Sequence, residues 1–145
     1  MFQSVLLTDD SKTTILIRFM VGAVFLSEGI QKFLFPEVVG SGRFEKIGFA
    51  YPAFWAAFTG SFEILCGNLI LAGLLTRLAA IPLLFIMMVA FVTTKYPILR
   101  EEGFWTMAHE TRTDFSMTLG NIFLLIKGGG KNSVDFRLMR SNRND

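Results

Sequence analysis

The sequence predicts an all-α fold, an integral membrane bundle of four antiparallel helices in one domain spanning residues 1–145. Of the 145 residues, 52% are hydrophobic and only 18% are charged, and the mean hydropathy is +0.49. The apolar residues gather in four blocks that approach the roughly 20 residues a helix needs to cross a bilayer. The second and third blocks lack the polar stripe that a helix of a soluble four-helix bundle would show. We therefore favour a membrane bundle over a soluble one.

The first predicted helix covers residues 14–35 and stops before Pro36. A cleavable signal peptide is the alternative. The block is long for such a signal, however, and no small-x-small cleavage site follows closely. The second helix covers residues 53–75 and contains a single charge, Glu63. We expect both helices to be permanent spans.

The third predicted helix, residues 78–96, is uncharged from Leu78 to Thr94, and the two-residue link before it makes an antiparallel hairpin. The fourth, residues 113–127, has uncharged residues only from 115 to 126, about 18 Å of helix. It crosses a bilayer only if Asp114 and Lys127 lie at the interfaces. Met87 and Met88 are expected to face lipid or fill the core.

Three connecting segments complete the chain. Residues 36–52 are expected to form a loop with a short surface helix near 44–47. Residues 96–112 are expected to connect the last two spans, and their aromatic residues suit a membrane interface. Residues 128–145 begin with three glycines and continue as a short basic tail.

Loop charges predict the orientation, because Lys and Arg accumulate on the cytoplasmic side. With four spans, the side of the termini has seven such residues and the other side has four. The seven are Lys12, Arg77, Lys127, Lys131, Arg137, Arg140 and Arg143; the four are Arg43, Lys46, Arg100 and Arg112. We therefore expect both termini in the cytoplasm.

Composition also excludes several kinds of chemistry. The chain has one cysteine, Cys66, and one histidine, His109. These do not suffice for an internal disulfide, a four-thiolate cluster, bis-histidine haem or a multi-histidine metal site. We expect no metal and no cofactor held by this chain alone, with Cys66 as a packing residue and His109 as a loop hydrogen-bonder. No basic and aromatic residues cluster as a nucleic-acid surface does.

Charges inside the predicted spans mark the candidate site. Glu63 lies roughly 15 Å into its helix, where an ionised carboxylate needs a partner or a proton. On the first helix Lys32 faces it, because side chains lean towards the helix N-terminus and these two helices run in opposite directions. Small residues let helices approach closely in lipid. The predicted contact stripes are Gly22 and Gly29 on the first helix and Gly60 and Gly67 on the second.

Further polar residues are candidates for the same site. Glu28 and Lys32 form an i, i+4 pair, Arg18 lies on the same stripe, and Lys95 leans inward from the third helix. Asp114 and Asn121 give the fourth helix a polar face. Such a site either binds a small polar head group and relays protons, or is an ion-pair clasp that only fixes helix register.

Three stretches of the chain resemble the DoxX family of small four-helix membrane proteins. They are RFMVGAVFLSEGIQKF, FEILCGNLILAGLLTRLAA and AHETRTDFSMTLGNIFLLIKGGGKNSVD, and the similarity extends from Arg18 to Asp135. The residues that fit the family pattern are Gly29, Lys32, Glu63, Gly67, Gly73, Arg77, Gly128, Gly130, Ser133 and Asp135. The resemblance implies a protein similar to the membrane subunit of thiosulfate:quinone oxidoreductase or to components of oxidative-stress complexes. More distant relatives, cargo receptors and chaperone-like proteins, are not enzymes.

Two functional hypotheses follow. In the first, the chain is a bacterial inner-membrane subunit with a pocket for a quinone or similar amphiphile, and a redox partner protein carries the cofactor. Glu63 and Lys32 then bind the ligand or exchange protons. In the second, it is a non-catalytic scaffold or chaperone-like protein that recognises membrane segments. Glycine-striped helices also permit a homo-oligomer.

Overall fold

The structure, a computed structural model, describes residues 8–141, and within that range all of the regular secondary structure is helical. The first seven residues and residues 142–145, which include Arg143 of the predicted basic tail, lie outside the described part. The helices are α2 (Thr14–Leu34), α3 (Ser41–Ile47), α4 (Pro52–Ala72), α5 (Thr76–Ala90), the π-helix η1 (Phe91–Lys95), α6 (Tyr96–Glu101), α7 (Phe104–Lys127) and α8 (Val134–Ser141).

Three helical segments, rather than the predicted four, are long and apolar enough to cross a membrane. They are Thr14–Leu34, Pro52–Ala72 and the continuous stretch Thr76–Glu101. Helix α7 is also long, with 24 residues. It is not among these three because charged residues in its first half, Glu110, Arg112 and Asp114, reduce its hydropathy.

The segment predicted to connect the last two spans is mostly helical. The third helix does not end before Pro97 but continues through η1 into α6. In η1 the amide of Tyr96 donates to the carbonyl of Phe91, five residues back. This wider turn accommodates a proline, which has no amide and would crowd the carbonyl four residues before it in a regular α-helix. Gly103, with φ 90°, makes the turn into α7, which therefore starts well before the predicted residue 113.

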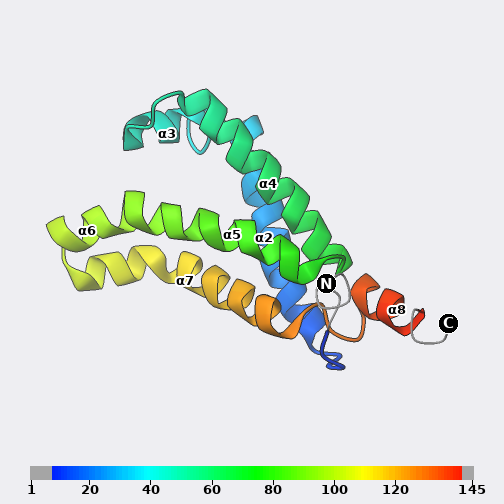
Figure 1. Cartoon of the computed structure of the whole chain (residues 1–145). Coiled ribbons are helices and arrows are strands. Elements are labelled where there is room, and N and C mark those ends of the chain that lie inside the picture. The colour runs from blue at the N-terminus through cyan, green and yellow to red at the C-terminus, as the bar shows by residue number, and fades with distance from the viewer. Residues whose placement is uncertain (1–7, 142–145) are drawn as a thin grey trace.

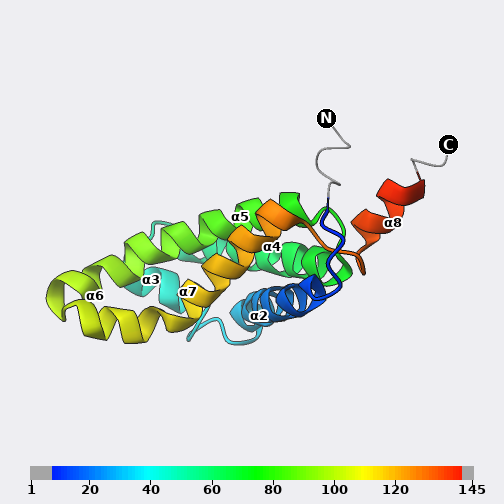
Figure 2. The same ribbon diagram turned by 90° about the horizontal axis from the view of Figure 1, so that it is seen from below.

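The helices form two pairs, α2 with α4 and α5 with α7, seen in Figures 1 and 2. The first pair packs through its glycines, as the spacing predicts. A Cβ on Gly29 would lie 2.7 Å from the carbonyl oxygen of Gly60, and one on Gly67 would lie 2.8 Å from the amide nitrogen of Leu26. Backbone therefore touches backbone along this contact.

The core lies where the two pairs meet. Its buried residues come from α2, α4, α5 and α7, and Cys66 packs among them as an apolar residue. We call the end of the bundle with the start of α2, the turn between α4 and α5, and α8 the near face. The opposite end, with α3 and α6, is the far face (Figure 1).

Candidate functional site

Lys32 of α2 and Glu63 of α4 form a buried ion pair. Nζ of Lys32 lies 2.6 Å from Oε2 of Glu63, and their side chains are 11% and 4% exposed. Gly29 and Gly60 bring the two helices together beside it. The pairing predicted from sequence spacing is present.

Two residues predicted at this site do not join the pair. Glu28 is half-buried one turn before Lys32 on α2. Arg18 lies fourteen residues before Lys32 on the same helix, roughly 21 Å away along its axis, near the other end. Arg18 and Lys32 do lie on one side of α2, as the sequence spacing predicts. Residues on one side of a helix can still lie far apart along its axis, so the shared side does not put both in one site.

Arg18 instead anchors the near face. Its buried guanidinium donates to four backbone carbonyls: Ile70 and Leu71 at the end of α4, and Gly129 and Asn132 in the segment after α7. Carbonyls at a helix C-terminus lack partners in their own helix, and a cation is favourable there. Arg18 therefore satisfies the end of α4 and ties it to the C-terminal segment.

Asp135 completes this anchor from α8. Its carboxylate accepts hydrogen bonds from the amides of Leu75 at 2.7 Å and Thr76 at 3.0 Å, which open α5. Its own amide donates to the carbonyl of Gly73 at 2.9 Å. A carboxylate at a helix N-terminus is stabilising. The anchor links residues distant in sequence, which spacing alone does not reveal.

Lys95 forms a second ion pair rather than joining Lys32 and Glu63. It is the last residue of η1, and its Nζ lies 3.1 Å from Oδ2 of Asp114 on α7 and 3.0 Å from the carbonyl oxygen of Glu110. Lys95 is nearly buried, whereas the Asp114 side chain is 35% exposed. Each of the two helix pairs therefore has its own Lys–carboxylate ion pair between its helices: Lys32–Glu63 joins α2 to α4, and Lys95–Asp114 joins η1 to α7.

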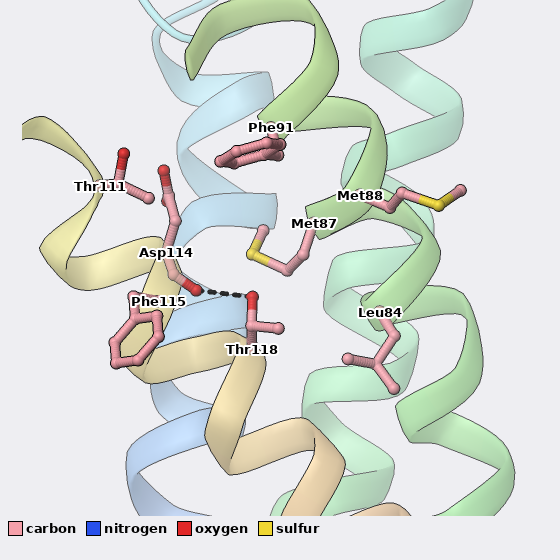
Figure 3. Close-up of a pocket in the computed structure, with 8 residues that line it drawn as sticks. All are labelled: Leu84, Met87, Met88, Phe91, Thr111, Asp114, Phe115 and Thr118. Atoms are coloured by element: carbon pink, nitrogen blue, oxygen red, sulfur yellow. Dashed lines mark hydrogen bonds between the residues drawn. The ribbon is translucent and has the colours of Figure 1, made fainter. Parts of the chain in front are cut away.

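A pocket of about 290 Å³ lies between α5 and α7 beside the second pair (Figure 3). Its lining residues are Leu84, Met87, Met88, Phe91, Thr111, Asp114, Phe115 and Thr118. Lys32 and Glu63 are not among them, so this pocket is in a different place from the predicted one. Figure 3 shows Asp114 and Thr118 facing Met87 and Phe91 across it.

Sequence reasoning missed the two threonines of this pocket and the role of the methionines. Thr111, Asp114, Phe115 and Thr118 are spaced i, i+3, i+4 and i+7, which is one face of a helix, so the pattern was available. Asn121, predicted to share the polar face of Asp114, is fully buried and donates from Nδ2 to the carbonyl of Met117. It does not line the pocket.

Fold and site together define a class of protein: an α-helical membrane protein whose helix pairs each enclose a lysine neutralised by a carboxylate of the neighbouring helix. Buried charges of this kind are rare in membrane segments, and they are paired when they occur.

The chain belongs to the DoxX family. The DoxX family model matches residues 13–96, which include Arg18, Lys32, Glu63 and Lys95. The chain is also 54% identical over 134 residues to an uncharacterized membrane protein of Mycobacterium tuberculosis, an alignment that covers 88% of this chain and 82% of the relative. No solved structure matches it.

Proposed function

We propose that the protein is the membrane subunit of a quinone-linked redox system and binds the head group of a quinone, or of a similar amphiphile, between α5 and α7. The observation that carries the proposal is the apolar pocket with the Lys95–Asp114 pair at its edge. Ligand pockets are mostly apolar with a few placed polar groups, and this one has that character.

The size of the pocket fits a head group rather than a whole lipid. Its volume of about 290 Å³ lies at the lower end of the range for small-molecule sites. Exposed apolar side chains of the same helices, such as Phe85 and Leu119, continue the surface beside it. A long hydrocarbon tail would lie against these residues and the surrounding acyl chains.

The polar wall of the pocket is rich in acceptors. Thr111 and Thr118 donate their hydroxyl protons to carbonyls of α7, at 2.6 and 2.7 Å. Their oxygens and the Asp114 carboxylate remain able to accept, while Lys95 balances the carboxylate charge. This wall therefore favours a head group with hydroxyl donors, as the reduced form of a quinone has.

A bound quinone would supply two-electron, two-proton chemistry. One cysteine and one histidine do not make a redox centre. The electrons therefore pass to or from a partner protein that carries its own cofactor.

The proposed topology has four crossings, with α7 as the fourth. At the near face Arg77 of α5 donates to the carbonyl of Ile126 at 2.7 Å, and towards the far face Lys95 pairs with Asp114. Because α7 contacts the stretch Thr76–Glu101 at both places, α7 lies at the same depth in the bilayer as that stretch. The count of seven basic residues against four supports a cytoplasmic near face, with the bundle in a bacterial inner membrane.

Purification in mild detergent followed by mass spectrometry of the extracted lipids tests the proposal. We expect a quinone to co-purify with the wild-type chain and to be lost from Met88→Trp, which fills the pocket. Leu78→Trp, at the exposed start of the same helix and outside the pocket lining, is the matched control and should retain it. A ligand-free chain that co-purifies with a stoichiometric protein would refute the quinone proposal and support the scaffold hypothesis.

A further inference from the structure

The near face can be located relative to the bilayer. The turn at residues 73–75 joins two helices that are each long and apolar enough to span it, so this turn lies at a membrane surface. Asp135 bonds to the amides of Leu75 and Thr76, which fixes the first turn of α8 at that surface. The amide of Lys131 donates to the carbonyl of Ser11, next to the start of the first span. The segment from Lys131 into α8 is therefore at the level of the lipid head groups.

Exposed basic side chains gather on this face. Lys127 and Lys131 pair with Asp9 and Asp10 at 3.1 and 3.4 Å. Within residues 8–141, Lys12, Arg137 and Arg140 are exposed and have no carboxylate within 4.0 Å. We call these last three residues the basic patch. The carboxylate of Asp135 does not compensate them, because it is buried and bound to backbone amides.

The far face has no comparable excess. Its loops and short helices, together with the start of α7, hold five glutamates and four basic residues. They are Glu37, Glu45, Glu101, Glu102, Glu110, Arg43, Lys46, Arg100 and Arg112. The net positive charge at a membrane surface is thus a property of the near face.

Helix α8 combines this charge with exposed apolar surface. Leu138 is 42% exposed, while Arg137 and Arg140 lie on the other side of the short helix. Figures 1 and 2 show α8 extending from the bundle beyond the turn between α4 and α5. A helix with one apolar and one basic side, held at the head-group level, is suited to a lipid surface.

We propose that the basic patch binds the phosphate groups of anionic phospholipids, with Leu138 against their acyl chains. The patch and the lipid phosphates have opposite charges, and the spans on either side of the turn put the patch at the level of the head groups. The proposed occupant is therefore a lipid rather than a soluble acidic protein. The proposal is independent of the pocket between α5 and α7, which lies about midway along the stretches Thr76–Glu101 and Phe104–Lys127.

The test is a titration of the full chain in neutral detergent with short-chain phosphatidylglycerol or phosphatidylcholine, followed by native mass spectrometry. Each basic residue near an anionic surface contributes about fivefold in binding. We expect Arg137→Gln/Arg140→Gln to weaken phosphatidylglycerol binding about 25-fold, with phosphatidylcholine unaffected. The control Arg43→Gln/Arg100→Gln, which removes the same charge from the far face, should bind as the wild type does.

Equal binding of the two lipids, or an equal loss in the control, would overturn the proposal. Competition by inorganic phosphate at the lipid concentration would also overturn it, since it would indicate a free-anion site. Both arginine side chains are exposed, so the variant should fold. Lys12→Gln/Arg140→Gln provides an independent second variant, with the same expected loss.

Discussion

Removing Lys32 should destabilise the protein more than removing the charge of Glu63. In Lys32→Met, the Glu63 carboxylate, 4% exposed, stays between α2 and α4 without its partner. Loss of one member of a buried pair typically lowers the free energy of unfolding by about 3–5 kcal/mol. In Glu63→Gln, the ammonium of Lys32 is only two residues from the end of α2 at Leu34 and can extend to the interface on its flexible stem. We expect a loss of about 1–3 kcal/mol there.

The double variant Lys32→Met/Glu63→Gln distinguishes a clasp from a set of independent contacts. It leaves no unpaired charge, so it should recover to within about 1 kcal/mol of the wild type. The assay is the free energy of unfolding in mixed micelles, measured by denaturant titration with circular dichroism for all four proteins. Lys131→Met breaks an exposed pair with Asp10 and should change stability by less than about 1 kcal/mol. Additive single effects, with a double variant as unstable as their sum, would refute this reasoning.

Three further substitutions test the packing and the near-face anchor by the same unfolding assay. Arg18→Lys keeps the charge, but an ammonium lacks the planar fork that reaches four carbonyls, so we expect a loss of about 2–4 kcal/mol. Unchanged stability would show that the extra donors contribute nothing. Asp135→Asn keeps the shape but weakens the cap of α5, and the free energy of unfolding should fall by about 1 kcal/mol; a rise would contradict the cap. Gly67→Leu pushes α4 away from the backbone of Leu26 and should lose about 2–3 kcal/mol, whereas Ala57→Leu on the exposed side of α4 should be neutral.

The sequence was most informative where the relevant contacts lie along one helix or between neighbours in the chain. The glycine stripes and the Lys32–Glu63 pair both follow from helical periodicity and from the opposite directions of two consecutive spans. Hydropathy likewise located three spans, because an apolar block of sufficient length has few alternatives.

Contacts between segments distant in sequence were less predictable. Lys95 was a candidate for the same site as Lys32, yet it is the last residue of the π-helix η1 and pairs with Asp114 of α7. Hydropathy gives no sign of that change in helical pitch. Residues 96–101 were expected to be a loop because a proline such as Pro97 usually ends a helix, whereas here the wider turn of the π-helix accommodates it. The partners of Arg18 after α7 could not be inferred because backbone carbonyls carry no sequence signature.

The Arg18 anchor has a consequence for biosynthesis. The guanidinium of Arg18 bonds to residue 129, which is 111 positions later, and to Asn132, 114 positions later. At a synthesis rate of about 5–20 residues per second, its last partners leave the ribosome roughly 6–20 seconds after Arg18 does. Until then the Arg18 guanidinium can bond only to the carbonyls of Ile70 and Leu71 at the end of α4. A chain truncated before these residues therefore exposes an incompletely satisfied cation, which distinguishes an unfinished protein from a complete one.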